Sequence, residues 1–396
     1  MRASGTVIPF DRAADIVRSA AGPLAREEVP LAEALGRAMP EEVRARFDSP
    51  PFDRSAMDGF AVRSGESARE LRITGTVAAG ALPPRIGPGE CARIMTGAML
   101  PEGTGRVIRL EYVRETGDRI EVFREETQSN VIRRGEGHRA GDVVLAPRIL
   151  EPQDLGILAS LGLERVAVSR RPTVAVLATG SELREQGNGL DDAAIYDSNG
   201  PQICAQVRSC GCEPRSLGRV ADDLARIEER IGAAAGSDLL IVSGGVSKGA
   251  FDFVPEALSR AGFETLLHGV AVRPGMPTLF ARRGAMCAFG LPGNTVSTFV
   301  IFEVLVRPLL RLMLRLPAEA EAVRGELDAP IRRRQTERLE FLPVRVDRGR
   351  VHPVPYRGSS HLSALASANG LLRIEAGVES LPEGTAVDVK LVRGRE

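Results

Sequence analysis

The chain has no excess of charge of either sign and no long apolar run. Its 396 residues carry 52 Lys and Arg against 52 Asp and Glu, so the formal net charge is zero. A field that recruits nucleic acid or an anionic membrane over the whole surface is therefore excluded. No apolar stretch approaches the roughly 20 residues that a membrane-spanning helix needs. We expect neither a nucleic-acid partner nor membrane insertion.

Cysteine is also scarce. Five cysteines are scattered along the chain: Cys91, Cys204, Cys210, Cys212 and Cys287. Their odd number and spacing argue against a disulfide framework. The pair at 210 and 212 is too close, with no partner pair nearby, to be a zinc site. Because the first residues also lack the apolar core of a signal peptide, we expect a cytoplasmic protein.

Standard nucleotide-binding fingerprints are missing as well. The chain has no G-x-x-x-x-G-K-[ST] and no G-x-G-x-x-G that opens a helix. A Walker P-loop is therefore excluded, and a dinucleotide site is not supported. Lysine is rare, because nearly all basic residues are Arg and only Lys248 and Lys390 are lysines.

The most informative segment that is present reads DLLIVSGGVSKGAFD, over residues 238–252. An apolar run at 239–242 predicts a strand, a small-residue turn follows at 243–249, and Asp252 begins a helix-like segment. Glycines let backbone N–H groups approach a ligand, and a helix N-terminus favours anions. The pattern therefore indicates a phosphate-bearing ligand, although a plain tight connection stays open as the alternative.

The alternation of elements predicts several domains, in a multidomain α/β and β fold. After residue 171, apolar runs alternate with helical spacing, including helices expected over 222–235 and 295–316, which predicts a parallel doubly wound α/β domain. Short apolar runs between turns indicate β-rich parts before and after it. The expected domains are an elongated, discontinuous N-terminal domain (1–46 and 140–171), a β-rich domain (47–139), the α/β domain (172–316) and a small C-terminal β domain (317–396).

Several motifs together carry a family resemblance. They are FDRSAMDGFA (52–61), IMTGA (94–98), ATGSEL (178–183), the turn at 243–252 and GLPGN (290–294), with YDSN (196–199) and VRPG (272–275). This set closely resembles the molybdopterin molybdenumtransferase family, which includes the molybdenum insertase of cofactor biosynthesis and the C-terminal part of gephyrin. The resemblance covers essentially the whole chain, and S-A-M-D-G and S-G-G-V-S are its most specific parts.

The resemblance implies an activity and an assembly. The family converts adenylylated molybdopterin and molybdate into molybdenum cofactor, with Mg²⁺, and releases AMP. It implies an elongated four-part subunit in a homodimer, with the active cleft between the α/β domain of one subunit and the β-rich domain of the other. Contact with other proteins of cofactor biosynthesis is also implied.

The resemblance further assigns site residues. The catalytic residues are Asp58, Thr96, Glu182 and Asp252. The residues that bind the pterin substrate are Ser243, Gly244, Gly245, Val246, Ser247, Lys248, Arg273, Pro292 and Gly293. The metal ligands are Glu182, Asp252 and Asp222. This chemistry is coherent, because carboxylate oxygens suit Mg²⁺ while glycine amides and cations suit a phosphoanhydride.

Each assignment has a structural alternative that the sequence leaves open. Asp58-Gly59 is also a turn pair, and the Thr96 hydroxyl could bond to its own backbone. Four acids also fit the start of a helix, where they stabilise its dipole: Glu182, Asp222, Asp223 and Asp252. His268 and His361 are lone histidines and are interpreted as structural.

The chain departs from the family pattern at several positions. Gly105 and Gly137 stand where the family commonly has acids, Met276 where it has lysine, and Thr295 where it has proline. Glu136 and Lys248 are the nearest replacements. The alternative hypothesis is therefore a non-catalytic or divergent paralogue that binds pterin or a partner protein. The sequence does not decide this, nor whether molybdenum or tungsten is inserted.

The missing lysine generates a first prediction. If the chain is an insertase, another cation must replace the charge-assisted bond that Met276 cannot form, which is worth roughly 1.5–3 kcal/mol. We expect Lys248→Ala to lower turnover more than Met276→Ala, and Met276→Lys to leave turnover equal or higher, measured as cofactor formation. An unchanged Lys248→Ala would refute the replacement.

Overall fold

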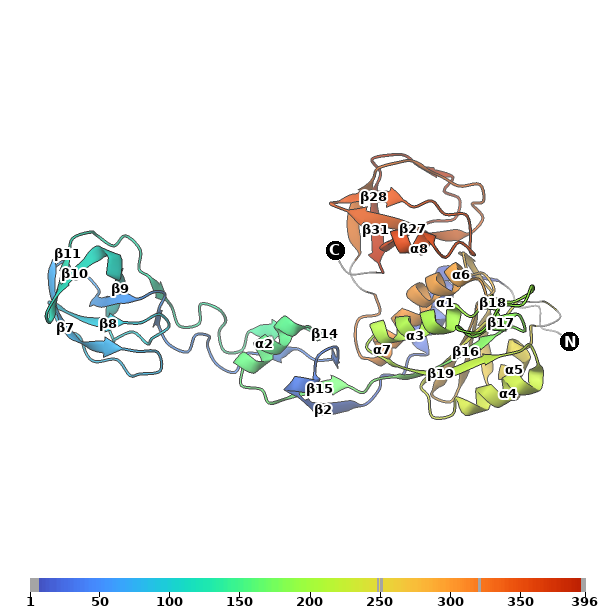
Figure 1. Cartoon of the computed structure of the whole chain (residues 1–396), viewed down its shortest axis with the longest axis horizontal. Coiled ribbons are helices and arrows are strands. Elements are labelled where there is room, and N and C mark those ends of the chain that lie inside the picture. The colour runs from blue at the N-terminus through green and yellow to red at the C-terminus, as the bar shows by residue number, and fades with distance from the viewer. Residues whose placement is uncertain (1–6, 248, 250–251, 320–321, 393–396) are drawn as a thin grey trace. The chain divides into compact units, whose positions relative to one another are not determined.

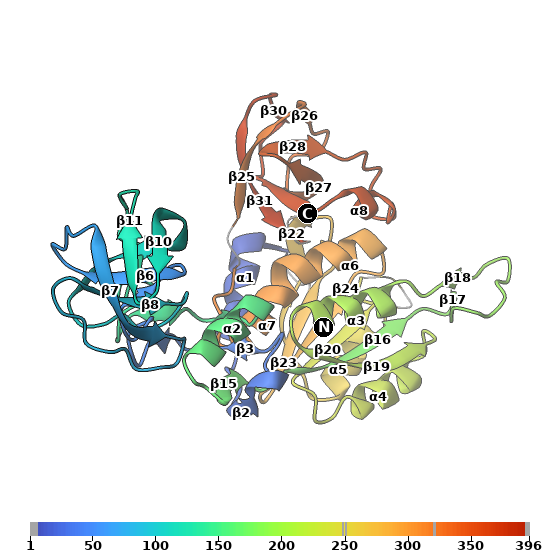
Figure 2. The same ribbon diagram turned by 60° about the vertical axis from the view of Figure 1, so that its left-hand side comes forward.

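The computed structural model describes residues 7–247, 249, 252–319 and 322–392. Two compact units make up the chain. The first, here the α/β unit, comprises Met1–Pro40, Arg148–Glu151 and Arg165–Glu396. The second, the β unit, comprises Glu41–Pro147 and Pro152–Glu164. Figure 1 labels many of their elements, and Figure 2 shows the same ribbon turned by 60° about the vertical axis. Lys248 lies outside the described residues.

The β unit is organised by a six-stranded sheet. Its strands, in spatial order, are β10 (Val113–Thr116), β11 (Arg119–Val122), β7 (Glu70–Val77), β8 (Glu90–Ile94), β6 (Gly59–Arg63) and β9 (Thr104–Arg109). Alternate side chains of β6 enter two different cores, Ala61 on one face and Phe60 and Val62 on the other. The remaining elements are β4 (Val43–Arg44), β5 (Arg54–Ser55), η2 (Leu110–Tyr112), β12 (Val131–Ile132), β13 (Val143–Leu145) and α2 (Pro152–Ser160).

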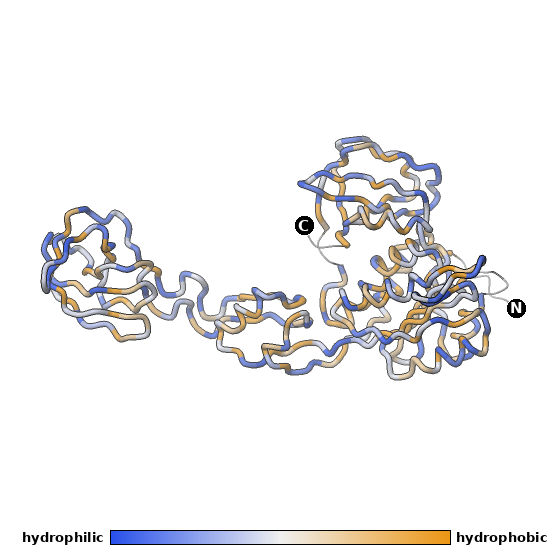
Figure 3. The backbone as a smooth tube through the Cα atoms, in the orientation of Figure 1, coloured by the Kyte–Doolittle hydropathy of each residue, from blue (hydrophilic) through white to orange (hydrophobic). Residues whose placement is uncertain are grey.

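A second six-stranded sheet forms the centre of the α/β unit. Its strands, in spatial order, are β19 (Glu213–Val220), β16 (Thr173–Thr179), β20 (Leu239–Ser243), β24 (Met286–Leu291), β23 (Leu279–Arg283) and β21 (Glu264–His268). The first four strands run parallel, which is the expected α/β pattern. The apolar runs of these strands appear orange in Figure 3.

Helices cover both faces of this sheet (Figure 1). On β20, Leu239 and Ile241 pack with α3 and α6, whereas Leu240 and Val242 pack with α4 and α5. The helices are α1 (Phe10–Ser19), α3 (Asn199–Ser209), α4 (Leu224–Ala233), α5 (Val254–Arg260), α6 (Thr295–Ile301), the π-helical turn η3 (Phe302–Val306) and α7 (Arg307–Met313). Both faces of these strands are buried in apolar cores. Polar side chains that a ligand could reach therefore occur only where the strands end.

Some expected elements differ from the observed ones. The strands β21 and β23 are not among the expected elements, and β23 runs antiparallel to β24. The helix expected over 222–235 begins at Leu224, with Asp223 as its N-cap. The helix expected over 295–316 is interrupted by the π-helical turn and ends at Met313. No helix follows Gly180, so Glu182 is not a first-turn acid.

The C-terminal part is a β-barrel that shares a sheet with the N-terminal segment. Its strands, in order, are β1 (Ile8–Pro9), β22 (Val270–Arg273), β27 (Leu339–Asp347), β28 (Arg350–Pro353), β25 (Val323–Leu327), β31 (Ala386–Leu391) and β29 (Gly370–Ile374), and β27 also pairs with β29. Smaller elements are η1 (Leu31–Glu33), α8 (Ala364–Ser367) and the pairs β2 (Arg26–Pro30) with β15 (Arg165–Ser169), β3 (Ala38–Met39) with β14 (Arg148–Ile149), and β26 (Ile331–Arg332) with β30 (Ser380–Leu381).

The expected N-terminal domain is divided between the units, since residues 1–40 group with the α/β unit and 41–46 with the β unit. Within the described part of the chain, the helices are all too short or too polar to cross a membrane.

Position 59 requires glycine because the backbone packs closely there, and not because it forms a turn. It opens β6 and pairs with both Ile94 and Arg109. A Cβ built at this position would lie 2.2 Å from the Ile108 carbonyl oxygen. The glycine of the S-A-M-D-G motif therefore lets β6 approach β9.

The same contact predicts a stability loss. Gly59→Ala should lower the free energy of unfolding by at least about 1–3 kcal/mol, the usual cost of overpacking, measured by chemical denaturation. Gly156→Ala is the control, because Gly156 lies within helix α2 with nothing within 4 Å of the built Cβ. That variant should be unchanged or more stable by about 0.5–1 kcal/mol. Equal stability of the two variants would contradict the packing argument.

Candidate functional site

One pocket of the α/β unit collects most of the residues that the motifs indicate. Its volume is about 500 Å³, and it lies where β16, β20 and β24 end. The predicted residues on its walls are Glu182, Asp222, Ser243, Gly244, Gly245, Val246, Ser247, Asp252, Pro292 and Gly293. We call this hollow the edge pocket. The carboxyl edge of parallel strands is where open α/β sheets bind ligands.

The glycine turn after β20 packs tightly on the end of β16. Gly244 and Gly245 have φ angles of 95° and 61°, in the region that favours glycine. A Cβ on Gly244 would lie 2.4 Å from the Thr179 carbonyl oxygen. His268 Nε2 lies 2.8 Å from the Val246 carbonyl oxygen, which gives this histidine the structural role expected of it.

This turn also leaves hydrogen-bond donors available. The Gly244 N–H donates to the Leu291 carbonyl oxygen at 3.0 Å. The N–H groups of Gly245, Val246 and Ser247 make no hydrogen bond to any described residue. Successive unused N–H groups in such a turn form a concavity that binds anions.

The carboxylates of the edge pocket are held by backbone donors. Asp222 accepts from the Ser181 N–H at 3.0 Å, and Asp252 accepts from the Gly249 N–H. Asp197, a fourth acid on the wall, accepts from the Gly200 N–H at 2.9 Å. In each case the hydrogen bond uses one carboxylate oxygen, and the other has no partner among the described residues. Glu182 is exposed, and its carboxylate accepts no hydrogen bond from the described chain, although its backbone carbonyl accepts from the Ile195 N–H at 3.0 Å.

The charges of the edge pocket are unbalanced. Its described walls carry four carboxylates, Glu182, Asp197, Asp222 and Asp252, and no basic side chain. A phosphate-bearing ligand would be repelled there unless a cation intervened. No three His, Cys, Asp or Glu side chains in the described residues converge as a ready-made metal site. Mg²⁺ does not need one, because it commonly uses one or two carboxylates together with substrate phosphates and water.

Asn199 is a pocket residue that the site assignments missed. Its Nδ2 donates to the Ser243 Oγ at 2.8 Å and to the Gly293 carbonyl oxygen at 2.7 Å. It thus joins α3 to the ends of β20 and β24. The side chain is only 9% exposed, and its Oδ1 has no partner in the described structure. The Y-D-S-N segment was the signal that contained it.

Asp58 and Thr96 meet in the β unit, as the motifs indicate for a shared site. Asp58 Oδ1 accepts from the Thr96 N–H at 2.7 Å and from the Thr96 hydroxyl at 2.8 Å. These two bonds, the backbone one first, hold the pKa of Asp58 below its ordinary value. Both side chains are exposed, so the ionised Asp58 is accessible to a ligand.

Arg273 lies outside the edge pocket. It lines a separate pocket of about 490 Å³ with Arg332, Arg334 and Arg357. Its Nε is 3.5 Å from Glu340, a buried carboxylate. The structure therefore does not bring Arg273 together with the glycine turn.

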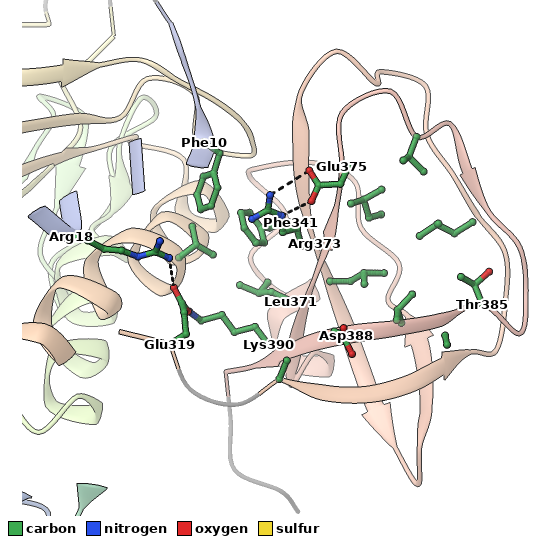
Figure 4. A pocket seen from close by; sticks show the side chains of 18 residues that line it. Phe10, Arg18, Glu319, Phe341, Leu371, Arg373, Glu375, Thr385, Asp388 and Lys390 are labelled. Atoms are coloured by element: carbon green, nitrogen blue, oxygen red, sulfur yellow. Dashed lines mark hydrogen bonds and ion pairs between the residues drawn. The ribbon is translucent and has the colours of Figure 1, made fainter. Parts of the chain in front are cut away.

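A larger pocket of about 560 Å³ lies between α1, η3 and the barrel (Figure 4). Phe10 and Phe341 pack edge to face there, with ring centroids 5.1 Å apart. Two of its cations, Arg18 and Lys390, pair with the same Glu319 at 3.1 and 2.9 Å. A third cation, Arg373, pairs with Glu375. None of the predicted site residues lines this pocket.

The positions that depart from the family pattern have clear local structures. A Cβ at Gly105 would lie 2.6 Å from the Ser64 Cα, so an acid there needs a backbone shift. Gly137 is less crowded, with the nearest atom, the Ser49 carbonyl oxygen, at 3.1 Å. Glu136 accepts from the Arg133 N–H at 2.8 Å and so caps its own turn. Met276 is 40% exposed.

Three family profiles match successive parts of the chain. The MoeA N-terminal region (domain I and II) matches residues 8–162 and the MoeA C-terminal region (domain IV) matches residues 325–392. Between them, a probable molybdopterin binding domain matches residues 175–312.

Known proteins are similar over nearly the full length. The molybdopterin molybdenumtransferase of Bacillus subtilis (strain 168) is 33% identical over 409 residues, covering 98% of this chain and 95% of its own. The molybdopterin molybdenumtransferase 2 of Mycobacterium tuberculosis is 35% identical, covering 91% and 94%. The crystal structure of the molybdopterin biosynthesis moeA protein from Pyrococcus horikoshii OT3 has a TM-score of 0.82 at 30% identity, covering 98% and 100%. These likenesses confirm the expected multidomain α/β and β fold.

The two adjacent acids after β19 have different roles, which gives a prediction. Asp223 is the N-cap of α4 and accepts from the Arg226 N–H at 2.9 Å, whereas Asp222 lines the edge pocket. Asp223→Ala should therefore lower the free energy of unfolding by about 0.5–2 kcal/mol, while Asp223→Ser keeps it, since Ser also caps. Thermal denaturation measures both. If Ala and Ser are equally stable, the capping role is wrong.

Proposed function

Because this chain belongs to the molybdopterin molybdenumtransferase family, and is a transferase of molybdenum cofactor biosynthesis, we propose that it inserts molybdenum from molybdate into adenylylated molybdopterin. In this reaction water cleaves the phosphoanhydride bond, so that AMP leaves and the pterin keeps its phosphate. The dithiolene sulfurs of the pterin bind the metal and displace molybdate oxygens, which leave as water. The proposal includes Mg²⁺ dependence and a cytoplasmic homodimer.

The edge pocket is the observation that carries the proposal. It combines three backbone N–H groups that have no acceptor among the described residues, and that suit phosphate oxygens, with carboxylates suited to a hard cation. An anionic substrate and an acidic wall are compatible only if a divalent cation lies between them. Glu182, Asp222 and Asp252 are the proposed holders of Mg²⁺. When bound, this ion would neutralise the charge that develops on the phosphoanhydride.

The residues of this chain would act by binding and orienting the substrate. The N–H groups of Gly245, Val246 and Ser247 would donate to the phosphates. The Asn199 amide fixes the Ser243 hydroxyl and the Gly293 carbonyl, and so holds the walls on either side of the turn. Asp58, kept ionised by Thr96, would accept a proton or a hydrogen bond as molybdate exchanges its oxygens for sulfur.

A divergent, non-catalytic paralogue stays the second candidate. The specific observation in its favour is Gly105, because its contact with Ser64 leaves no room for the carboxylate that the family commonly has there. Such a protein would bind the pterin without releasing AMP.

One experiment separates these two functions. The chain should restore molybdoenzyme activity to an insertase-deficient strain, and the purified protein should release AMP from adenylylated molybdopterin only when molybdate and Mg²⁺ are present. Binding of the pterin without AMP release, together with failed complementation, would favour the paralogue.

Charge removal at the two proposed sites gives a sharper prediction. Asp58→Asn and Glu182→Gln keep the size of each side chain and remove its charge. We expect AMP release to fall on the order of 10²-fold or more, as when a charged group that stabilises the transition state is removed, with the thermal midpoint nearly unchanged.

Glu185→Gln is the matched control, because Glu185 is an exposed acid of the same segment that does not line the edge pocket. It should retain activity. Full activity in both Asp58→Asn and Glu182→Gln would disprove the site assignment.

The homodimer also gives a prediction. The proposed catalytic residues are divided between the two units of the chain, Asp58 and Thr96 in one and the edge pocket in the other. We expect analytical ultracentrifugation at micromolar concentration to show a species of twice the 42.4 kDa chain mass. A monomer alone would refute the proposed assembly.

The five cysteines, all free and buried, support the cytoplasmic location.

A further inference from the structure

Two separate loops supply Asp58 and Thr96. The loop 56–58 leads from β5 into β6, and the loop 95–98 follows β8. The ladder between these strands ends at the pair Gly59 and Ile94. Beyond that pair, the two segments are joined by the backbone bonds of Ser55 with Gly97 and Ala98 and by an isolated bridge between Arg54 and Met99. These bonds do not involve Asp58 or Thr96. Their own hydrogen bonds are exposed, and exposed bonds contribute little net free energy because water competes for both groups.

Ser55 is bonded to both loops at once. Its N–H donates to the Ala98 carbonyl oxygen at 3.0 Å, and its carbonyl oxygen accepts from the Gly97 N–H at 2.8 Å. Its hydroxyl donates to the Met57 carbonyl oxygen at 2.5 Å. The residue is fully buried, with 0% exposure. The backbone of Ser55 thus fixes the Thr96 loop, while its hydroxyl fixes the chain next to Asp58.

Asn130 holds the first loop from a third segment. Its carbonyl oxygen accepts from the Ala56 N–H at 2.9 Å. To present that oxygen, Asn130 adopts a φ of 53°, which asparagine tolerates better than most residues. Its side chain is 7% exposed and donates from Nδ2 to the Val107 carbonyl oxygen at 2.8 Å, which anchors the turn to β9.

We propose that Ser55 and Asn130 are positioning residues that hold the Asp58 carboxylate against Thr96. They touch neither substrate nor cation. Their effect passes through the loop backbone to the Asp58–Thr96 hydrogen bonds, and these bonds keep Asp58 ionised. The catalytic importance of this geometry rests on the proposed function, whereas the geometry itself can be tested on the protein alone.

The decisive variant is Ser55→Ala, which removes one hydroxyl from a buried site without adding volume. If Asp58 loses its fixed contact with Thr96, its pKa should rise toward the ordinary aspartate value. Titration of aspartate labelled with ¹³C, followed by NMR and assigned with Asp58→Asn, measures this directly.

Turnover should report the same change. If the ionised form of Asp58 is the active one, a higher pKa moves the acid limb of the pH–rate profile to higher pH. We expect kcat to fall on the order of 10- to 100-fold, as for a small misplacement of a reacting group, with KM for the pterin nearly unchanged.

Thr104→Val is the matched control. The Thr104 hydroxyl donates to the Pro101 carbonyl oxygen at 2.7 Å, is also buried, and lies in the same unit. Its loss should cost comparable stability and leave the Asp58 pKa unchanged. Asn130→Gly is the second variant, because glycine adopts the same φ while the side-chain bonds to Val107 and Glu126 are lost. We expect it to raise the Asp58 pKa less than Ser55→Ala does.

The proposal is overturned if Ser55→Ala lowers the thermal midpoint but leaves the Asp58 pKa where it is in the unmodified protein. It is equally overturned if Thr104→Val shifts that pKa as much. An unchanged pKa in Asn130→Gly would remove Asn130 from the proposal. If Ser55→Ala shifts the pKa while Asp58→Asn retains full AMP release, the positioning role holds and the proposed catalytic role of Asp58 fails.

Discussion

Burial of both faces of β16, β20 and β24 is the constraint on which the α/β unit depends. Alternate residues of these strands enter cores on opposite sides of the sheet, so neither face can carry a polar side chain. The polar residues therefore follow the last apolar position of each strand. Because the strands are parallel, these ends meet at one edge. The edge pocket is a consequence of this arrangement, as are the glycines that let its turns lie so close together.

The second constraint is electrostatic. Carboxylates that line the edge pocket are held by backbone N–H groups at Ser181, Gly200 and Gly249, which fixes them but does not neutralise them. Next to them, the N–H groups of the glycine turn have no protein acceptor in the described structure. A site with fixed negative charge and free donors is suited to a ligand that brings both a cation and anionic oxygens. The ligand that we propose, a phosphoanhydride with a bound cation, meets both requirements.

In the β unit, the ionised carboxylate of Asp58 lies at an exposed surface. Asp58 accepts hydrogen bonds from Thr96. Buried groups of Ser55 and Asn130 form hydrogen bonds that fix the two loops carrying these residues. Close packing of Gly59 against Ile108 brings β6 and β9 together beneath the same loop. The accessible carboxylate of Asp58 is thus held in a fixed direction by residues that are buried.

The sequence by itself determined the family, the fold class and most of the edge pocket, because apolar runs that end in glycine turns define strand ends locally. It also indicated Asp58 with Thr96, since both lie in specific motifs. The tertiary structure alone decided which acid caps a helix and which lines the pocket, because Asp222 and Asp223 are neighbours in sequence but point to different partners. It separated Arg273 from the glycine turn, and it revealed Asn199, Ser55 and Asn130. Their roles depend on contacts between segments far apart in the chain, and no local pattern records such contacts.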